Sequence, residues 1–448
     1  MNSIWGCPPL RYRSQRPMKQ TVSHAKRLRG AISVPGDKSI SHRSVLFNAL
    51  AEGNAEITGF LPGADCLSSI ACLRQMGVEI EHSDDKVRVF GRGLRGLREP
   101  SDVLDCGNSG TTLRLLAGLL AGQPFLSVLT GDASLRSRPQ KRIVEPLRQL
   151  GAKLDGRDNG NRAPLVIRGT TIHGGNYELP IASAQVKSAL LLAGLTGDAP
   201  MRLSGKIVSR DHTERMLIAM GIDLTVKDDE IVLYPPSHPV FPYPLSLHVP
   251  GDPSSATFWW VAAAIHPDAE ITTLGVGLNP SRTGALDVLK AMGADITISN
   301  ERNEGAEPVG DVTVRGGGLR GTRIDGDLIP RLIDEIPVLA VAAACAVGET
   351  VVADAEELRA KETDRVATVV SELTAMGATL EATPDGMIIA GGGELQGAHV
   401  QSHGDHRIAM ALAVAGLVAE GETIIDEAEA VTVSYPTFWQ HYAQIKEA

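Results

Sequence analysis

Four features are scarce or missing in this chain of 448 residues: aromatic residues, paired cysteines, long apolar runs and metal-binding clusters. Aromatic residues make up only 4% of it, so the core must be built mainly from Ala, Leu, Val and Ile. The five cysteines are scattered without a Cys-x-x-Cys pair, which favours reduced thiols over a disulfide framework or a zinc site. No apolar run is long and clean enough to span a bilayer, and no metal-binding cluster of suitable spacing occurs. We therefore expect a cytoplasmic protein with no metal and no membrane partner.

Positive charge is also in short supply. The 43 Lys and Arg residues are outnumbered by 53 Asp and Glu residues, which gives a net charge of −10. Binding of nucleic acid needs a basic face, so this balance argues against a nucleic-acid partner. Small anionic ligands remain possible, because local clusters of Lys and Arg can focus positive potential in a cleft.

One pattern is present in six copies, each built around an apolar run with helical character. Polar starts precede these runs at intervals of 72, 74, 70, 80 and 72 residues, marked by Ser39, Thr111, Gln185, Ser255, Glu335 and Arg407. In five copies a second, amphipathic helix ends at a glycine, the common residue just beyond a helix end: Gly77, Gly151, Gly221, Gly293 and Gly377. Short β-branched or alternating segments follow and predict a pair of strands. Each copy is thus predicted to contain strand, buried helix, strand, amphipathic helix and strand pair.

Two similar Gly/Pro-rich stretches, residues 34–37 and 248–252, flank the first three copies. We expect paired crossings between two similar α/β (α+β) lobes of three units each, with a cleft between them. Residues 38–248 would form lobe one, and residues 1–37 with 249–448 would form lobe two. Residues 1–27 are expected to be a flexible basic arm, with an organelle-targeting segment as the alternative.

Charged and hydroxyl residues gather where the helices begin. A helix start carries unpaired N–H groups and a partial positive charge, so several starts directed at one point would bind anions. Equivalent starts carry unlike residues, including Lys38-Ser39, Ser183-Ala184-Gln185 and Asp334-Glu335, which favours an asymmetric ligand with phosphate and carboxylate groups. Lys361 and Arg365 lie four residues apart and are predicted to share a helical face. Taken singly, each segment is equally consistent with ordinary helix caps and solvated charges.

In combination these segments resemble the EPSP synthases of the enolpyruvyl transferase family. The matching segments are residues 35–43, 107–114, 138–139, 183–185, 358–365 and 405–410, in the order found in that family. The resemblance implies two lobes of three βαβαββ units, an inside-out α/β barrel, with the active site in the cleft between them. It also implies that the enolpyruvyl group of phosphoenolpyruvate passes to the 5-hydroxyl of shikimate 3-phosphate by addition and elimination, with release of phosphate. This step in aromatic amino-acid biosynthesis needs no cofactor, and a monomer is expected.

The resemblance also implies roles for individual residues. Asp334 would be the base for the 5-hydroxyl, Glu362 the acid for the methylene carbon, and Lys38 would touch both substrates. Shikimate 3-phosphate would be held by Lys38, Ser39, Arg43, Ser183, Ala184, Gln185, Ser209, Arg210, Asp334 and Lys361. Phosphoenolpyruvate would be held by Lys38, Asn108, Gly110, Arg138, Gln185, Arg365 and Arg407.

Three positions depart from the family pattern, in a way that resembles its divergent bacterial branch. Ala184 stands where many members have a second Ser, Leu115 where many have Pro, and Val433 where many have a Lys that contacts phosphate. Gly110 stands where some glyphosate-tolerant members have Ala, and we hypothesise that its missing Cβ leaves room for that inhibitor.

Two alternatives stay open. One is the UDP-N-acetylglucosamine enolpyruvyl transferase, which has the same fold but would require a reactive Cys in the loop of residues 131–142, where this chain has none. The other is a non-catalytic repeat protein that binds anions.

Overall fold

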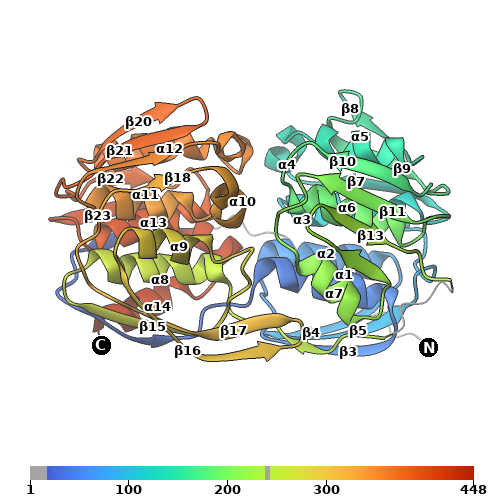
Figure 1. Cartoon of the computed structure of the whole chain (residues 1–448), viewed down its shortest axis with the longest axis horizontal. Helices are drawn as coiled ribbons and strands as arrows, with labels where there is room; N and C mark the ends of the chain where they lie inside the picture. The colour runs from blue at the N-terminus through green and yellow to red at the C-terminus, as the bar shows by residue number, and fades with distance from the viewer. Residues whose placement is uncertain (1–17, 238–242, 448) are drawn as a thin grey trace, which may run out of the picture.

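The computed structural model describes residues 18–237 and 243–447. The described residues build two separate hydrophobic cores, one from residues between Ile40 and Val249 and the other from residues between Val22 and Val34 together with Ala256 to Ile445. Figure 1 shows the corresponding two lobes side by side. We refer to the lobe of the first core as lobe one and to the lobe of the second as lobe two. The division at residues 38–248 stays a prediction.

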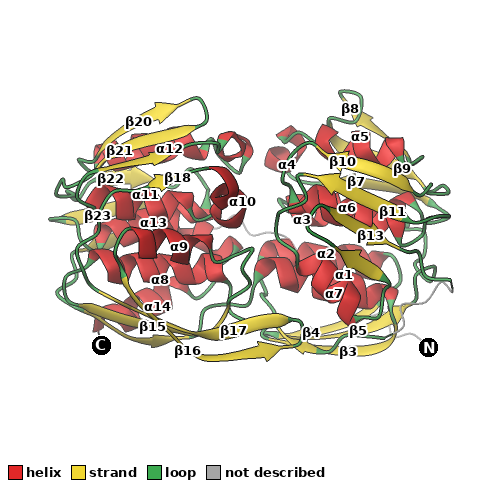
Figure 2. Ribbon diagram, viewed as in Figure 1, coloured by secondary structure: helices red, strands yellow, loops and turns green. Residues whose placement is uncertain are grey.

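Each lobe is built from three sheets, which Figure 2 shows on the outside of the helices. The sheets of lobe one have the strand orders β14-β3-β5-β4, β6-β7-β9-β8 and β10-β11-β13-β12. Their strands are β3 Glu52–Thr58, β4 Glu79–Ser83, β5 Lys86–Arg92, β6 Leu104–Asp105, β7 Leu126–Thr130, β8 Lys153–Arg157, β9 Arg162–Arg168, β10 Gly175–Leu179, β11 Met201–Gly205, β12 Leu224–Val226, β13 Glu230–Leu233 and β14 Leu247–His248. In every sheet the first two strands are parallel, and the remaining pairings are antiparallel.

Lobe two repeats this plan with the strand orders β16-β17-β15-β2, β18-β19-β21-β20 and β1-β23-β22. Its strands are β1 Gln20–Ser23, β2 Leu28–Ile32, β15 Ala269–Gly277, β16 Asp295–Glu304, β17 Glu307–Arg315, β18 Arg323–Ile324, β19 Glu349–Val352, β20 Thr379–Thr383, β21 Gly386–Ala390, β22 His399–Gln401 and β23 Glu422–Asp426. The expectation of a flexible arm is wrong for Gln20–Ser23, because β1 pairs along its whole length with β23. Residues 1–17 of that predicted arm lie outside the described residues.

The six predicted buried helices are present and form the lobe interiors: α1 Lys38–Leu50, α3 Gly110–Ala121, α6 Ala184–Gly194, α8 Pro253–Ile265, α11 Ile336–Cys345 and α13 His406–Gly416. Such helices are apolar on all sides because they are surrounded by other elements. In α8, for example, residues 253–264 are all buried. Five of the six starts are capped by a side chain that accepts a backbone N–H, namely Asp37, Ser109, Ser183, Asp252 and Asp405.

A second helix follows in each unit: α2 Ala64–Gln75, α5 Lys141–Gln149, α7 His212–Ala219, α9 Gly284–Ala291, α12 Arg365–Ala375 and α14 Phe438–Glu447. The five predicted terminal glycines have φ values of 85°, 89°, 83°, 93° and 87°, the left-handed region that glycine enters without strain. Short helical segments complete the fold: α4 Ala133–Ser137, α10 Ile329–Leu332, η1 Gly326–Leu328, η2 Glu356–Ala360 and η3 Ala428–Val433.

The chain crosses between the lobes twice, and the two crossings are joined to each other. The backbone N–H of Asp37 donates to the carbonyl of Pro250 at 2.8 Å, and the N–H of Asp252 donates to the carbonyl of Pro35 at 2.9 Å. A Cβ on Gly36 would lie 1.9 Å from the carbonyl oxygen of Gly59, so only glycine fits this contact. The crossings therefore form one compact hinge region.

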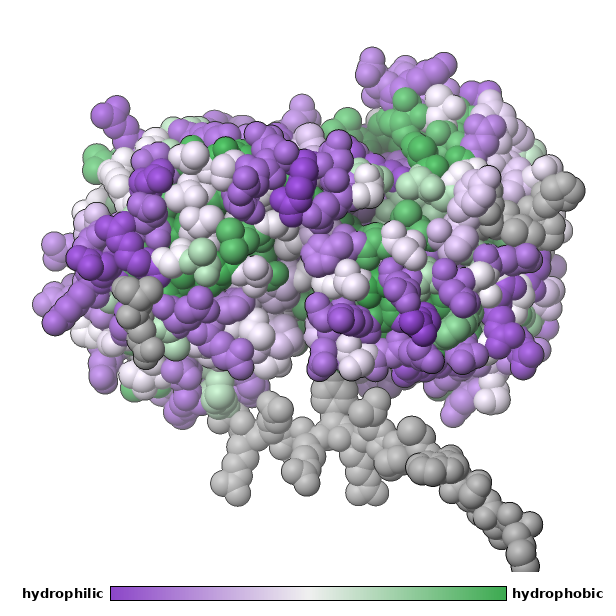
Figure 3. Space-filling view, turned by 90° about the horizontal axis from the view of Figure 1, so that it is seen from below, coloured by the Kyte–Doolittle hydropathy of each residue, from purple (hydrophilic) through white to green (hydrophobic). Residues whose placement is uncertain are grey.

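The hairpin of β16 and β17 makes a further connection, since it extends from lobe two beneath lobe one (Figure 1). The carboxylate of Glu307, at the start of β17, lies 2.7 Å from Nδ1 of His212, at the start of α7. Seen from below, the molecule is mainly polar at its surface, with apolar patches on each lobe (Figure 3). None of the helices in the described ranges is long and apolar enough to cross a membrane.

Candidate active site

The helix starts of both lobes meet around one cavity. Its inner part has a volume of about 130 Å³ and continues into a wider opening of about 720 Å³. Lobe one contributes the starts of α1, α3 and α6, whereas lobe two contributes the start of α13 and the segments around Asp334 and Lys361. The fold thus brings helix starts that carry different residues to one point, as expected from the sequence.

Most of the predicted site residues line this inner cavity: Lys38, Ser39, Arg43, Gly110, Arg138, Ala184, Gln185, Arg210, Asp334, Lys361, Glu362, Arg365 and Arg407. Ser183 and Ser209 lie in the wider opening instead. Ser183 also caps α6, so its hydroxyl accepts the N–H of Val186. Asn108 lines neither part of the cavity. Its side-chain oxygen accepts a hydrogen bond from the guanidinium of Arg138, which does line the inner part.

Asp334 lies among four cations at the end of α10. Its carboxylate is 2.7 Å from Nη2 of Arg210, 3.3 Å from Nη1 of Arg365 and 3.6 Å from Nζ of Lys361. Arg407 donates to its backbone carbonyl at 3.2 Å. Burial raises the pKa of Asp334, but Lys361 and the three arginines outweigh this effect and hold the pKa well below its usual range. The carboxylate is therefore ionised before any ligand binds.

Glu362 is the second carboxylate of the cavity and faces the first turn of α12. Its Oε2 is 2.5 Å from Nη2 of Arg365, and its Oε1 is 3.9 Å from Nη1 of Arg138. Burial raises its pKa, yet Arg365, His406 and Arg138 together bring the pKa well below its ordinary value. Glu362 is thus also ionised in the empty cavity, although the proposed role of proton donor requires its protonated form.

The predicted helical face shared by Lys361 and Arg365 is wrong. Residues Glu356–Ala360 form a 3-10 turn, Lys361 is extended, and α12 starts only at Arg365. The local break lets both side chains reach Asp334 from different directions.

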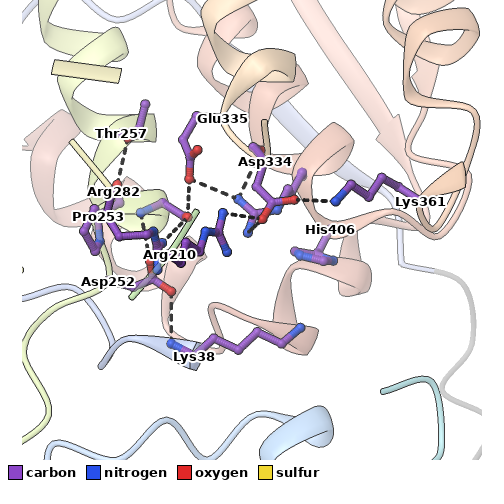
Figure 4. Close-up of polar contacts among 12 residues, drawn as sticks. Lys38, Arg210, Asp252, Pro253, Thr257, Arg282, Asp334, Glu335, Lys361 and His406 are labelled. Carbon is purple, nitrogen blue, oxygen red and sulfur yellow. Dashed lines mark hydrogen bonds and ion pairs between the residues drawn. The ribbon is translucent and has the colours of Figure 1, made fainter. Parts of the chain in front are cut away.

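Lys38, at the start of α1, is paired with Asp65 of α2. Burial lowers the pKa of Lys38, but the adjoining Asp65 carboxylate outweighs burial and raises the pKa above its ordinary value. The ammonium group is therefore charged and fixed at the cavity wall (Figure 4). Asp65 belongs to no motif, so no sequence pattern points to it.

Lobe one supplies a surplus of guanidinium groups. Arg114 donates to Oε1 of Gln140 at 3.1 Å and to Oε1 of Gln185 at 2.6 Å. Its pKa falls to about 9, because it is buried and because Arg142 and Arg138 lie nearby. Burial is the larger of these causes, and the two neighbouring guanidinium groups add to it because positive charges are crowded in this part of the cavity. An anionic ligand would offset these charges.

The space beside Gly110 faces the end of the Arg114 side chain, while the hypothesis that this space admits glyphosate stays a prediction. A Cβ on Gly110 would lie 2.9 Å from Nη1 of Arg114. The missing Cβ therefore makes room for the guanidinium of the chain's own Arg114, one turn further along α3.

Several lining residues were not assigned roles from the sequence: Asp65, Arg114, Arg142, Asp252, Ser254, Arg282 and His406. Arg114 and His406 lie in the segments 107–114 and 405–410, which match the family pattern and so carry a signal for both residues, whereas Arg142 lies outside the matching segments. Arg282 follows β15 in an ordinary loop and carries no local signal. Within residues 18–237 and 243–447, no group of three or more His, Cys, Asp or Glu side chains could hold a metal ion.

Comparison with known proteins identifies the family. The profile described as EPSP synthase (3-phosphoshikimate 1-carboxyvinyltransferase) matches residues 22–442. The chain belongs to this family. A 3-phosphoshikimate 1-carboxyvinyltransferase of Chloroflexus aurantiacus is 68% identical over 430 residues, which cover 96% of this chain and 99% of the relative. One of Roseiflexus castenholzii is 67% identical over 431 residues, with 96% and 100% covered.

Solved structures support the same family and fold. An EPSP synthase from Acinetobacter baumannii superposes with a TM-score of 0.84 at 43% identity, covering 96% of this chain and 98% of that one. The enolpyruvyl transferase NikO from Streptomyces tendae has a TM-score of 0.78 at 16% identity, with 96% and 97% covered, and so shares the fold. The predicted two-lobe α/β architecture is confirmed.

Proposed function

We infer that this protein transfers the enolpyruvyl group of phosphoenolpyruvate to the 5-hydroxyl of shikimate 3-phosphate. The observation that carries this proposal is the meeting of Lys38, Arg138, Arg365 and Arg407 around two carboxylates in one cleft. Both substrates carry several negative charges, and closely spaced cations of fixed geometry bind such groups strongly. Family membership supplies the identity of the substrates, whereas the cavity supplies the charge pattern that they need.

Each of the two carboxylates, Asp334 and Glu362, has its own proton-transfer step. Asp334 takes the proton of the 5-hydroxyl as the hydroxyl oxygen forms a bond to C2 of phosphoenolpyruvate. Glu362 gives a proton to the methylene carbon C3, which produces a tetrahedral adduct. Loss of a proton from C3 and cleavage of the bond between C2 and the phosphate oxygen then give 5-enolpyruvylshikimate 3-phosphate and phosphate. Cations preorganised around the reacting phosphate stabilise the charge that develops on it.

The substrates also prepare these carboxylates for their roles. In the empty cavity the cations are balanced partly by Asp334 and Glu362 themselves, which keeps both pKa values low. Anionic substrates bound to the same cations take over this balance. The pKa of each carboxylate then rises, so that Glu362 can carry a proton and Asp334 becomes a stronger base.

We propose that shikimate 3-phosphate lies toward lobe one and the wider opening, where Ser183, Ser209 and Arg210 are found. Phosphoenolpyruvate lies deeper, among Arg138, Arg365 and Arg407. Val433 is absent from both cavity linings, whereas the guanidinium of Arg142 lines both parts and supplies a cation on the lobe-one side.

Phosphate release with both substrates present tests the function. We expect release only when shikimate 3-phosphate and phosphoenolpyruvate are supplied together. Release with UDP-N-acetylglucosamine in place of shikimate 3-phosphate would favour the related transferase, and binding without release would favour an anion-binding protein.

We further propose that the enzyme works as a cytoplasmic monomer and is a target of glyphosate. All proposed substrate contacts come from one chain, which a monomer can supply. Cys66, Cys72, Cys106 and Cys345 are unpaired thiols, as expected in a reducing compartment.

A further inference from the structure

A buried arginine holds the hinge region together. Arg282 lies between β15 and α9, and its side chain is 1% exposed. Nη1 donates to Asp37 at 2.6 Å, while Nη2 donates to Asp252 at 2.8 Å and to the hydroxyl of Ser254 at 2.7 Å. Burial lowers the pKa of this guanidinium, but Asp37 and Asp252 outweigh burial and raise the pKa above its ordinary value. The group is permanently charged, and both of its terminal nitrogens have hydrogen-bond partners, whereas Nε has none among the described residues.

The two carboxylates bound by Arg282 belong to different crossings. Asp37 ends the first crossing and caps α1, whereas Asp252 ends the second and caps α8. Oδ2 of Asp252 also accepts the backbone N–H of Lys38 at 3.1 Å. One guanidinium thus fixes the relative positions of two helix starts that belong to different lobes.

The same network continues toward the reacting groups through Glu335. The hydroxyl of Ser254 donates to Oε1 of Glu335, whose residue is only 1% exposed. This oxygen lies 4.0 Å from Nη1 of Arg407, and Glu335 directly follows Asp334 in the chain. Figure 4 shows these contacts running from Lys38 and Asp252 past Arg282 to Glu335 and Asp334. Glu335 is not a lining residue of the cavity, so it stands behind the residues that would meet substrate.

We propose that Glu335 is a positioning residue for enolpyruvyl transfer. Held by Ser254, which in turn accepts a hydrogen bond from Arg282, its carboxylate keeps the Arg407 guanidinium beside Asp334 and so ties the phosphoenolpyruvate site to the hinge region. The physical basis is that the negative charge of a buried carboxylate must be balanced by positive charge nearby. Here the balancing charges are Arg282 on the side of the hinge region and Arg407 on the side of the cavity. The proposal rests on the function inferred above.

The variant Glu335→Gln removes the charge and keeps the shape of the side chain. We expect the KM for phosphoenolpyruvate to rise by about tenfold, as for the loss of one charge-assisted contact, while the KM for shikimate 3-phosphate changes less than about twofold. The matched control is Glu372→Gln in α12. Glu372 is also a buried carboxylate of lobe two, and it accepts the N–H of Gln401 at 2.9 Å and lies 3.1 Å from Nε2 of His403. This control should lose thermal stability without a change in either KM.

A second variant keeps the test decisive if Glu335→Gln does not fold. Ser254→Ala removes the hydroxyl that bridges Arg282 and Glu335, and we expect a smaller rise in the same KM. The double variant should have the same KM for phosphoenolpyruvate as Glu335→Gln alone, because both substitutions break the same series of contacts from Arg282 through Ser254 to Glu335. Unchanged KM values, or equal rises for both substrates, would overturn the positioning role. Absence of phosphate release by the unmodified enzyme would instead overturn the function, so the two failures can be told apart.

Discussion

Arg210 of lobe one and Asp334 of lobe two form an ion pair across the cleft, with 2.7 Å between Nη2 and Oδ2. Both residues are proposed to act on shikimate 3-phosphate, yet in this structure each is the partner of the other. Binding of this substrate must therefore exchange a contact between the lobes for contacts with the ligand. The pair keeps the cleft walls close together and the two side chains oriented before substrate arrives.

Replacing Arg210 with Gln should weaken binding of shikimate 3-phosphate selectively. Loss of one charge-assisted contact predicts a rise of roughly tenfold or more in its KM, with a smaller effect on phosphoenolpyruvate. Steady-state kinetics with each substrate varied in turn measures the difference. An effect confined to phosphoenolpyruvate would assign Arg210 to the other subsite.

Glu362→Gln should separate binding from chemistry. The amide preserves the size of the side chain but cannot give a proton to carbon, so we expect turnover to fall by ~100-fold or more while both substrates still bind. Equilibrium binding and phosphate release, measured on the same preparation, provide the comparison. Near-normal turnover would remove Glu362 from the role of proton donor.

Formation of the ternary complex should take up a proton. The pKa of Glu362 is low in the free enzyme because Arg365, His406 and Arg138 outweigh the opposing effect of burial. Substrate anions offset these cations and raise the pKa, so a proton is bound rather than released. Calorimetry in buffers of different ionisation enthalpy, at mildly alkaline pH where the substrate phosphates are dianions, measures this uptake. Glu362→Gln serves as the control, and equal uptake by this variant would assign the proton to another group.

Gly110→Ala should disturb Arg114 first. The new Cβ would lie 2.9 Å from Nη1 of Arg114, which must move away from Gln185. We expect a higher KM for phosphoenolpyruvate and, if the enzyme is inhibited by glyphosate, a higher inhibition constant. Gly317→Ala is a suitable control, since a Cβ there meets no atom within 4 Å. An unchanged inhibition constant would show that the contact between Gly110 and Arg114 does not govern access of the inhibitor.

Acid should destabilise the protein through His42. Its pKa falls to about 3, chiefly because it is buried, whereas the unfolded chain has an ordinary histidine. Between the two values the unfolded chain binds more protons, so stability is full above the unfolded pKa and is lost as the pH falls toward the folded pKa. From pH ~6.5 to ~4.5 this group alone costs about 2 kcal/mol.

The variant His42→Gln should show a weaker dependence of melting temperature on pH in that window. Nδ1 of His42 lies 2.8 Å from the hydroxyl of Ser69, a contact that a glutamine amide can replace. A slope equal to that of the unmodified protein would assign the acid sensitivity elsewhere, for instance to His406, whose pKa falls to about 4 for the same main reason.

Features of the fold and the site could be predicted from the sequence where neighbouring residues determine them, and could not be predicted where residues far apart in the chain determine them. Helix starts and terminal glycines were predicted because capping and left-handed backbone leave local marks, as at Gly77 and Gly377. The role of Arg282 was missed because its partners Asp37 and Asp252 lie 245 and 30 residues away, and no local pattern records such contacts. The helical face of Lys361 was predicted wrongly because spacing alone does not reveal a 3-10 turn that ends just before it.

The pairing of β14 with β3 and of β2 with β15 has a consequence for synthesis on the ribosome. Lobe one completes its first sheet with His248, so all its strands are available once that residue has left the exit tunnel. Leu28, by contrast, pairs with Ala269, which is translated only after the whole of lobe one. Strand β2 must therefore wait for its partner while lobe one, which is translated after β2, is already able to fold.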